Sequence, residues 1–306
     1  MAFSLSPDRR LSSEVRRIML HQLEAATTQL ASIGDPESDE AIHDARRRVK
    51  KVRAVIRLIR PDFDKAFRTV DKDLHDVNRL LAPIADGQGI IGTIDALGQR
   101  YRKLLPARVV AAIRAGLVEL GTRTDRQAVR DHVLQTSAAT LRDERRRVKH
   151  WQLRTDGFHT LAPGLEANFR KAREAMLAAQ SRPTVNRYLK WRGLVKNHWF
   201  HVRLLESHCG HRLVADERRL EALDGVLGEY HNLALLREVL DHHGYVSRAQ
   251  TARCLRAISA YQRLLRQHAQ PLGATIYRET PRGFVRRVKH LWKESPSNHR
   301  TRQSTP

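Results

Sequence analysis

The feature that most limits how this chain can fold is an apolar pattern of helical period that runs through almost all of it. Apolar residues return every three or four positions, and no useful stretch alternates apolar and polar residues as a half-buried strand does. The first run opens at Leu11 and stops at Gly34-Asp35-Pro36, where glycine and proline are typical of a helix end. The pattern predicts an all-α fold.

Proline and glycine divide the rest of the chain into further helices. We expect these near residues 39–60, 64–82, 88–104, 107–119, 125–152, 161–180, 184–207, 212–228, 230–242 and 248–269. The pattern becomes less regular after Pro271, and residues 294–306 predict a disordered tail.

The charge of the chain indicates what kind of partner it meets. The 306 residues carry 56 Lys and Arg against 33 Asp and Glu, a net charge of +23, which favours a polyanion such as nucleic acid, an anionic membrane or polyphosphate. Two cysteines build no disulfide framework, and no apolar stretch approaches the roughly 20 residues that span a bilayer. Without the apolar run of a secretory signal at the N-terminus, we expect a soluble, cytoplasmic protein with no membrane insertion.

The chain also contains an internal repeat. A gapless shift of 146 positions aligns Arg46 with Arg192, Val49 with Val195, Lys50 with Lys196, Arg57 with Arg203, Leu58 with Leu204, Leu74 with Leu220, Leu81 with Leu227 and Asp86 with Asn232. Helical heptads can imitate such matches, which leaves a chance origin open. The repeat predicts two homologous helical-bundle halves, residues 10–155 and 156–293, packed about a pseudo-twofold axis.

Two repeat-related segments concentrate the positive charge. At about 100° per residue, one face of the first segment carries His43, Arg46, Arg47, Lys50, Arg53 and Arg57, and the core face carries Ala45, Val49, Val52, Ile56 and Ile59. In the second segment Arg192, Lys196 and Arg203 share a stripe with Tyr188, Trp199 and Glu206. No acidic residue on the first face offsets its charges, whereas a chain of phosphates would. A solvated helix surface is the alternative, but recurrence in both halves favours two stripes that line one basic central groove or pore.

These residues resemble the signature helices of a known family. His43-x-x-Arg46-x-x-x-Lys50-x-x-Arg53 and Lys190-Trp191-Arg192-x-x-x-Lys196-x-x-Trp199-Phe200-x-x-Arg203 are similar to the two signatures of the CHAD family, a helical domain named for its histidines. Residues 168–173 and 227–236 fit it too, so the resemblance spans residues 10–293. It implies two four-helix bundles about a pseudo-twofold axis and a basic central surface that binds inorganic polyphosphate. Family members are binding modules associated with polyphosphate granules.

The sequence departs from the family pattern at two places. Leu189 stands where the second signature has its histidine, and Asn232 stands where the family has an aspartate that the first half keeps as Asp86. The missing histidine removes a donor from one half of the site, so we leave open whether the site binds symmetrically. The Arg and Lys positions remain.

Two other functions compete with this interpretation. The pairs His43-Asp44 and His75-Asp76 could belong to a metal-dependent phosphohydrolase, but no spacing selects further ligands from the 16 histidines of the chain. Nucleic acid is the more serious alternative, because phosphates dominate affinity there as well and residues 142–149 and 286–290 are basic. No helix-turn-helix, zinc-finger or RNA-recognition signature accompanies them.

The sequence therefore predicts a protein that binds inorganic polyphosphate without catalysis, located in the cytoplasm at polyphosphate granules. The predicted binding residues are His43, Arg46, Arg47, Lys50, Arg53, Arg57, Arg192, Lys196 and Arg203. We expect no catalytic residue, no metal and no cofactor, and nucleic acid only as a weaker or competing polyanion. His43 would add one donor, and Trp199 would pack rather than bind.

Overall fold

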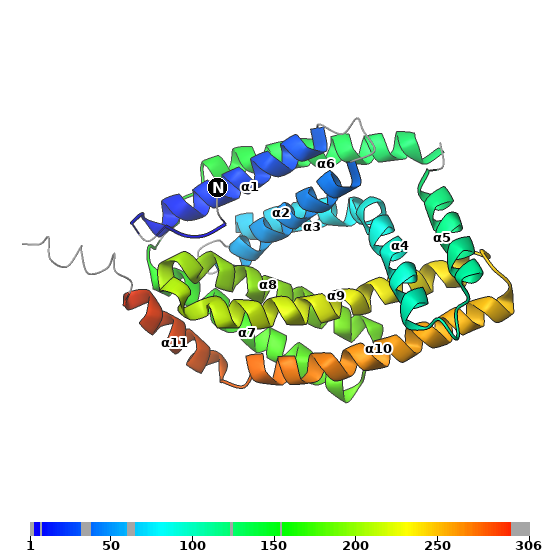
Figure 1. Cartoon of the computed structure of the whole chain (residues 1–306). Coiled ribbons are helices and arrows are strands. Elements are labelled where there is room, and N and C mark those ends of the chain that lie inside the picture. Colours follow the sequence, from blue (N-terminus) through cyan, green and yellow to red (C-terminus); the bar gives the residue numbers. More distant parts are fainter. Residues whose placement is uncertain are drawn as a thin grey trace, which may run out of the picture.

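The structure, a computed structural model, describes residues 3–6, 8–31, 38–59, 65–122, 125–153 and 155–294. Within these residues the chain forms eleven α-helices and one 3₁₀ turn, with no strand, which confirms the all-α prediction (Figure 1). The helices are α1 (Leu11–Ala31), α2 (Ser38–Leu58), α3 (Lys65–Leu80), α4 (Ala82–Arg100), α5 (Ala107–Thr122), α6 (Asp125–Lys149), α7 (Phe158–Ser181), α8 (Val185–Cys209), α9 (Val214–His242), α10 (Arg248–Ile276) and α11 (Pro281–Lys293), and the turn is Gly210–Leu213.

Prolines account for most of the differences from the predicted helix boundaries. The predicted break from Pro83 to Gly89 is wrong: α4 already begins at Ala82, and Pro83 lies in its first turn, where a missing backbone N–H costs little. Glu229 stands 146 positions after Pro83, and there a single helix, α9, replaces the two predicted at 212–228 and 230–242. Helices α3 and α4 are thus separate elements that meet beside a proline, whereas α9 is continuous through Glu229.

Near the C-terminus the chain is more regular than we predicted. Helix α10 continues through Pro271 to Ile276, and α11 follows, with the Thr280 side chain accepting a hydrogen bond from the Gly283 backbone N–H at 3.0 Å. Phe284 and Val288 on α11 are buried, so packing rather than local pattern holds this segment in place. Residues 295–306 of the predicted tail lie outside the described residues.

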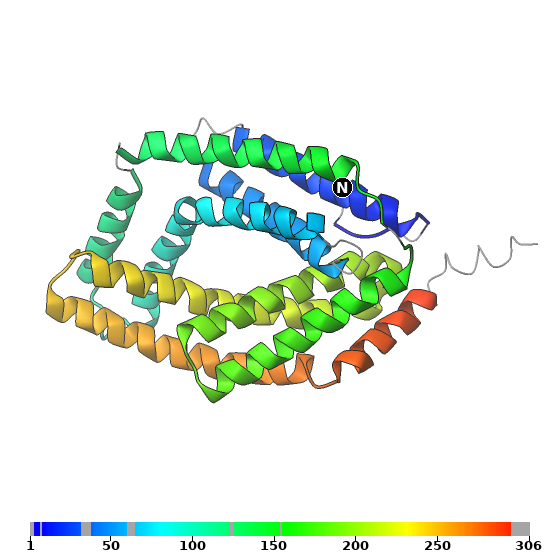
Figure 2. The same cartoon turned by 180° about the vertical axis from the view of Figure 1, so that it is seen from behind.

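The helices surround a central pair. In both views α1 and α6 lie side by side along one edge of the molecule, and α10 follows α9 along the opposite edge (Figure 1, Figure 2). Helices α4 and α5 pack together at one end, and α11 contacts α7 near the other. Between the edges, α2 contacts α1, α3, α4, α7 and α8, and α8 contacts α7 and α9 as well. The two halves therefore meet where α2 packs on α8; their relation by a pseudo-twofold axis stays a prediction.

The core follows from this central position. The predicted core face of α2, namely Ala45, Val49, Val52, Ile56 and Ile59, is buried as expected, and so are Ala54, Val55 and Leu58 on its other sides. Close contact with α7 requires a glycine, because a Cβ at Gly164 would lie 1.9 Å from the carbonyl oxygen of Leu58. The backbones of α2 and α7 are so close at this point that only the hydrogen of a glycine fits between them.

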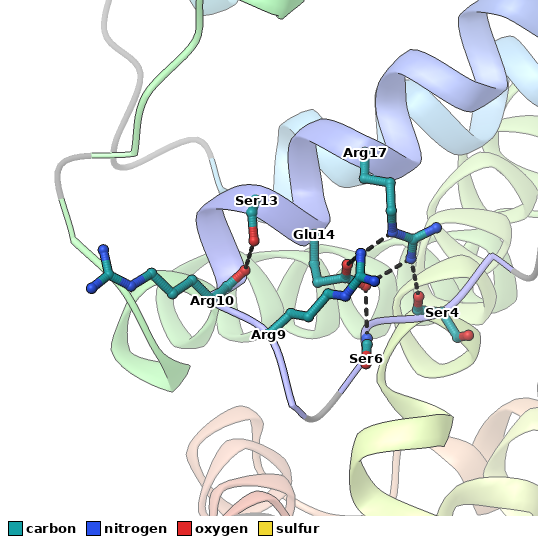
Figure 3. A network of polar contacts seen from close by, with 7 residues as sticks. All are labelled: Ser4, Ser6, Arg9, Arg10, Ser13, Glu14 and Arg17. Atoms are coloured by element: carbon teal, nitrogen blue, oxygen red, sulfur yellow. Dashed lines mark hydrogen bonds and ion pairs between the residues drawn. The ribbon is translucent and has the colours of Figure 1, made fainter.

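The N-terminal segment ties the two halves together. The backbone N–H of Leu5 donates to the carbonyl oxygen of Leu204 on α8 at 2.9 Å. On α1 the buried carboxylate of Glu14 accepts from the Ser6 backbone N–H at 2.9 Å and from both Nε and Nη2 of Arg17, at 2.8 and 2.7 Å (Figure 3). The hydrogen bonds from Arg17 hold the pKa of Glu14 below its ordinary value, against the opposing effect of burial. This network fixes residues 4–6 over the start of α1.

Candidate functional site

The packing of α2 on α8 brings basic residues of the two halves together. Arg46 and Lys50 project from α2, and Arg192 and Lys196 from α8; we call these four residues the central basic cluster. The charges of Arg46, Lys196 and Arg192 all act on the ammonium group of Lys50. Two segments that are far apart in sequence thus contribute cations to one place.

Two carboxylates from other helices neutralise half of this cluster. Arg46 Nη1 lies 2.6 Å from Asp86 Oδ1 of α4, and Lys196 Nζ lies 2.8 Å from Asp224 Oδ2 of α9. In the part of the chain that the structure describes, neither Lys50 nor Arg192 forms an ion pair. When Lys50 is protonated, the cluster therefore keeps two positive charges without a carboxylate partner.

The predicted shift of 146 positions aligns each of these two carboxylates with an amide. The residue 146 positions after Asp86, the partner of Arg46, is Asn232, and the residue 146 positions before Asp224 is Asn78. Under this alignment, each half has one carboxylate and one amide at these two positions. The departure at Asn232, noted from the sequence, is one of the two amides.

Burial and like charges lower the pKa values of the two lysines of the cluster. Burial, reinforced by Arg46, Lys196 and Arg192 and opposed by Asp86, lowers the pKa of Lys50 to about 7. Burial also lowers the pKa of Lys196, although Asp224 opposes it. An anion that binds beside such a lysine stabilises its protonated form.

The same junction holds buried nitrogen atoms without hydrogen-bond partners. These are Nε of Arg46, Nε of Arg192 and Nδ1 of His231 on α9. Burial, with the charge of Arg192, lowers the pKa of His231 to about 4, so its imidazole is neutral near neutral pH. A Cβ at Gly228 would lie 3.7 Å from Nη2 of Arg192, so α9 passes close to this guanidinium. Buried polar groups in folded proteins are normally satisfied, so these three nitrogen atoms, together with the unpartnered Oδ1 of Asp224, mark the junction as polar but incompletely hydrogen-bonded.

The remaining predicted site residues lie outside the central basic cluster and are mostly paired. Asp71 of α3 binds both Arg53, at 2.9 Å, and Arg57, at 3.2 Å, and Glu217 of α9 binds Arg203 at 3.0 Å. Arg57 and Asp71 stand 146 positions before Arg203 and Glu217, so the ion pair recurs in both halves.

Our expectation that no acidic residue offsets the first basic face is therefore wrong. Asp44 binds Arg47 from within α2, at 2.9 Å, and Asp71 and Asp86 reach the face from α3 and α4. The sequence of the segment could not show carboxylates that tertiary packing supplies. The side chain of His43 is accessible to solvent, but partial desolvation by its neighbours and the charges of Lys50 and Arg46 lower its pKa.

Trp199 packs, as we expected. Its ring stacks on Phe200 with the centroids 5.5 Å apart. The charged groups of Lys196 and Arg203 lie over the Trp199 ring, 5.8 and 5.4 Å from its centroid. Tyr188, which the helical pattern places on the basic stripe, is buried against Tyr230, because α8 is covered by neighbours on several sides. The stripe on α8 is thus shorter than its sequence indicates.

The sequence did not indicate that His231 lies beside the central basic cluster. It belongs to the stretch 227–236 that fits the family, but its position opposite Lys50 and Arg192 depends on how α9 packs. Neither the helical pattern of α9 nor the spacing of its residues contains that information.

The other basic stretches are substantially paired. Arg147 binds Asp73 and Glu144, at 3.1 and 2.6 Å, and Arg287 binds Asp216 and Glu279, at 2.8 and 2.7 Å. Among the described residues no group of three or more His, Cys, Asp or Glu side chains is placed to hold a metal ion. No helix in the described ranges is long and apolar enough to cross a membrane.

Comparisons with known proteins support this fold. The sequence matches the model of the CHAD domain family over residues 17–241. No curated protein matches the chain. The fold is similar to the crystal structure of the CHAD domain from the plant Ricinus communis, with a TM-score of 0.59 and 15% sequence identity over 95% of each chain. At that identity the likeness concerns the fold alone.

Proposed function

This chain belongs to the CHAD domain family, and we propose that it binds inorganic polyphosphate at the central basic cluster without hydrolysing it. Membership of the family is consistent with polyphosphate binding in general. The observation that carries the proposal for this chain is the pair of unneutralised cations, Lys50 and Arg192, at the contact of α2 and α8.

Polyphosphate fits the chemistry of this position. Every phosphate carries negative charge and oxygen atoms that accept hydrogen bonds, whereas the cluster offers only donors: two guanidinium and two ammonium groups. Holding four cations together with only two carboxylates beside them is unfavourable, since like charges repel strongly where burial reduces screening. A bound polyanion reverses the sign of that interaction.

The ion pairs give the predicted binding residues different roles. Asp86 and Asp224 orient Arg46 and Lys196, and these cations still have donors to spare for phosphate oxygens. The outer cations that we predict to extend the contact along the chain of phosphates are His43, Arg47, Arg53, Arg57 and Arg203. Carboxylates already hold four of these five, so their contributions to affinity should be smaller than those of Lys50 and Arg192.

Calorimetric titration with long-chain polyphosphate at about 150 mM salt tests the proposal. The double variant Lys50→Met with Arg192→Gln should bind at least tenfold more weakly than the wild type. Arg286→Gln with Lys289→Gln is the matched control, because it removes the same charge from exposed positions on α11. Arg46 is a poor choice for charge reversal, since a glutamate there would face Asp86 in a buried position.

The outcomes separate the alternatives. A similar loss in both double variants would mean that only net charge matters, which contradicts a specific site. Duplex DNA that displaces polyphosphate at equal phosphate concentration would favour nucleic acid as the ligand. Affinity for polyphosphate should fall steeply with salt, because bound phosphates release counterions.

Absence of turnover and location in the cell need their own measurements. We expect no release of orthophosphate from polyphosphate, with or without added Mg²⁺, and sustained release would contradict a binding function. A fluorescent fusion should gather at polyphosphate granules in the cytoplasm. The Lys50→Met, Arg192→Gln variant should remain dispersed.

A further inference from the structure

Lys50 differs from the other three members of the central basic cluster. Arg46 and Lys196 each have a carboxylate, and Arg192 is a guanidinium that stays protonated at any physiological pH. Lys50 is the member that combines an amine with the lack of an ion pair in the described part of the chain. An amine in this position can lose its proton and so relieve the repulsion from its neighbours.

Groups from four helices surround this amine. Arg46 lies one turn before it on α2, Arg192 and Lys196 face it from α8, and His231, which is neutral, faces it from α9. Asp86 of α4 is the carboxylate that acts on it, and Arg46 already holds that carboxylate at 2.6 Å. Asp224 of α9 is likewise paired with Lys196. Asp71 of α3 is paired with both Arg53 and Arg57.

We propose that binding of polyphosphate at the central basic cluster is coupled to uptake of one proton by Lys50. This inference rests on the proposed function. In the free protein near pH 8 the amine is largely neutral, with a lone pair on Nζ. A phosphate oxygen that arrives beside it supplies the missing negative charge, and the amine takes a proton from solvent to become an ammonium donor. No bond to phosphorus forms or breaks.

Lys50 takes up the proton because the electrostatic potential at its amine changes from positive to negative when the ligand binds. Burial and three neighbouring cations lower the pKa of Lys50 to about 7 in the free protein. A bound anion within hydrogen-bond distance favours the charged form and raises the pKa again. Between these two values, the protein with its ligand holds one proton more than the protein without it, so affinity should weaken as pH rises above 7.

Calorimetry of the full chain at pH 8 measures the proton directly. The heat of binding long-chain polyphosphate is recorded in Tris, HEPES and tricine, whose ionisation enthalpies differ, and its slope against those enthalpies counts protons taken up. We expect close to one proton per bound site. Histidines contribute little at this pH, since burial lowers the pKa values of both His43 and His231.

Two lysine variants assign the proton. Lys50→Arg keeps a positive charge that does not titrate, so it should bind polyphosphate and take up almost no proton. Lys51→Arg is the matched control, because burial and Arg203 lower the pKa of Lys51 to about 8, yet Lys51 faces Arg47 and Arg48 outside the cluster. Because the ligand also reaches Arg47 and Arg203 beside Lys51, Lys51→Arg should remove a smaller part of the uptake than Lys50→Arg does.

Each result decides something. Tight binding of wild type without proton uptake, or equal uptake by wild type and Lys50→Arg, overturns the proton linkage and leaves the proposed function intact. Failure of wild type to bind polyphosphate at all overturns the proposed function itself. Between pH 7.5 and 8.5 the affinity of wild type should fall by up to about tenfold relative to that of Lys50→Arg.

Discussion

Lys196 Nζ lies 2.8 Å from Asp224 Oδ2, across the contact between α8 and α9. Lys50, the lysine 146 positions earlier, has no such partner in the described part of the chain, and the position that corresponds to Asp224 is Asn78. The two halves therefore place the same cation at the same junction with different electrostatic consequences.

Removal of the Asp224 carboxylate should strengthen binding and weaken the fold. In Asp224→Asn, Lys196 loses its counter-ion, so the cluster gains one unbalanced positive charge and should bind polyphosphate several-fold more tightly. The free energy of unfolding in urea should fall by about 1–3 kcal/mol, because a partly buried pair is broken. Asp95→Asn, which removes the carboxylate beside exposed Arg114, is the control and should change neither quantity much. Unchanged affinity in Asp224→Asn would contradict the role given to the unpaired charges.

Lys50 should also make the free protein more stable at higher pH. Its pKa is about 7 in the folded chain and about 10.5 in the unfolded chain, so between these values the unfolded state binds the extra proton. Stability then rises with pH through that window, and the destabilising effect is fully present below pH 7. Chemical unfolding at pH 7 and pH 9 should show a larger gain for wild type than for Lys50→Met. Equal gains would mean that Lys50 does not titrate in this range.

His201 should also make stability rise with pH, in this case on the acidic side. Its Nε2 donates to the carbonyl oxygen of Ala54 at 2.9 Å, and burial lowers its pKa to about 4 despite that hydrogen bond. Between pH 6.5 and 4 the unfolded chain binds a proton that the folded chain does not, so stability falls as pH falls. His201→Leu should cost about 1 kcal/mol at pH 7.5 and should lose less stability than wild type on going to pH 5. Parallel loss in both proteins would exclude His201 as a source of the acid dependence.

Gly164 should tolerate no side chain. A Cβ there would meet the Leu58 carbonyl oxygen at 1.9 Å, and backbone atoms cannot move aside as a flexible side chain can. Gly164→Ala should therefore lower the unfolding free energy by about 1–3 kcal/mol, although alanine is the better helix former. Gly225→Ala on α9 is the matched control: a Cβ there meets nothing within 4 Å, and the change should stabilise by about 0.5–1 kcal/mol. A stable Gly164→Ala protein would mean that α2 and α7 can separate without penalty.

Much of this molecule follows from local sequence. The apolar period predicts an all-α chain and the buried face of α2 from Ala45 to Ile59, because a helix presents every third or fourth residue to one side whatever its neighbours are. The spacing of Arg46, Lys50, Arg192 and Lys196 was also visible, and so was the family resemblance that the match over residues 17–241 confirms. Proline was a less reliable guide, since Pro83 separates two helices and Pro271 lies within one.

Tertiary structure alone decided which of these cations are neutralised. Asp71, Asp86 and Asp224 stand 14 to 40 positions away in sequence from the basic residues that they bind, and His231 reaches the cluster from a third helix. An ion pair depends on a few ångströms between side chains of different helices, and those distances are set by how the helices cross, which the period within each helix does not contain. The sequence by itself thus determined the helices and their basic faces, and the packing of α2, α4, α8 and α9 determined that Lys50 and Arg192 carry the unbalanced charge.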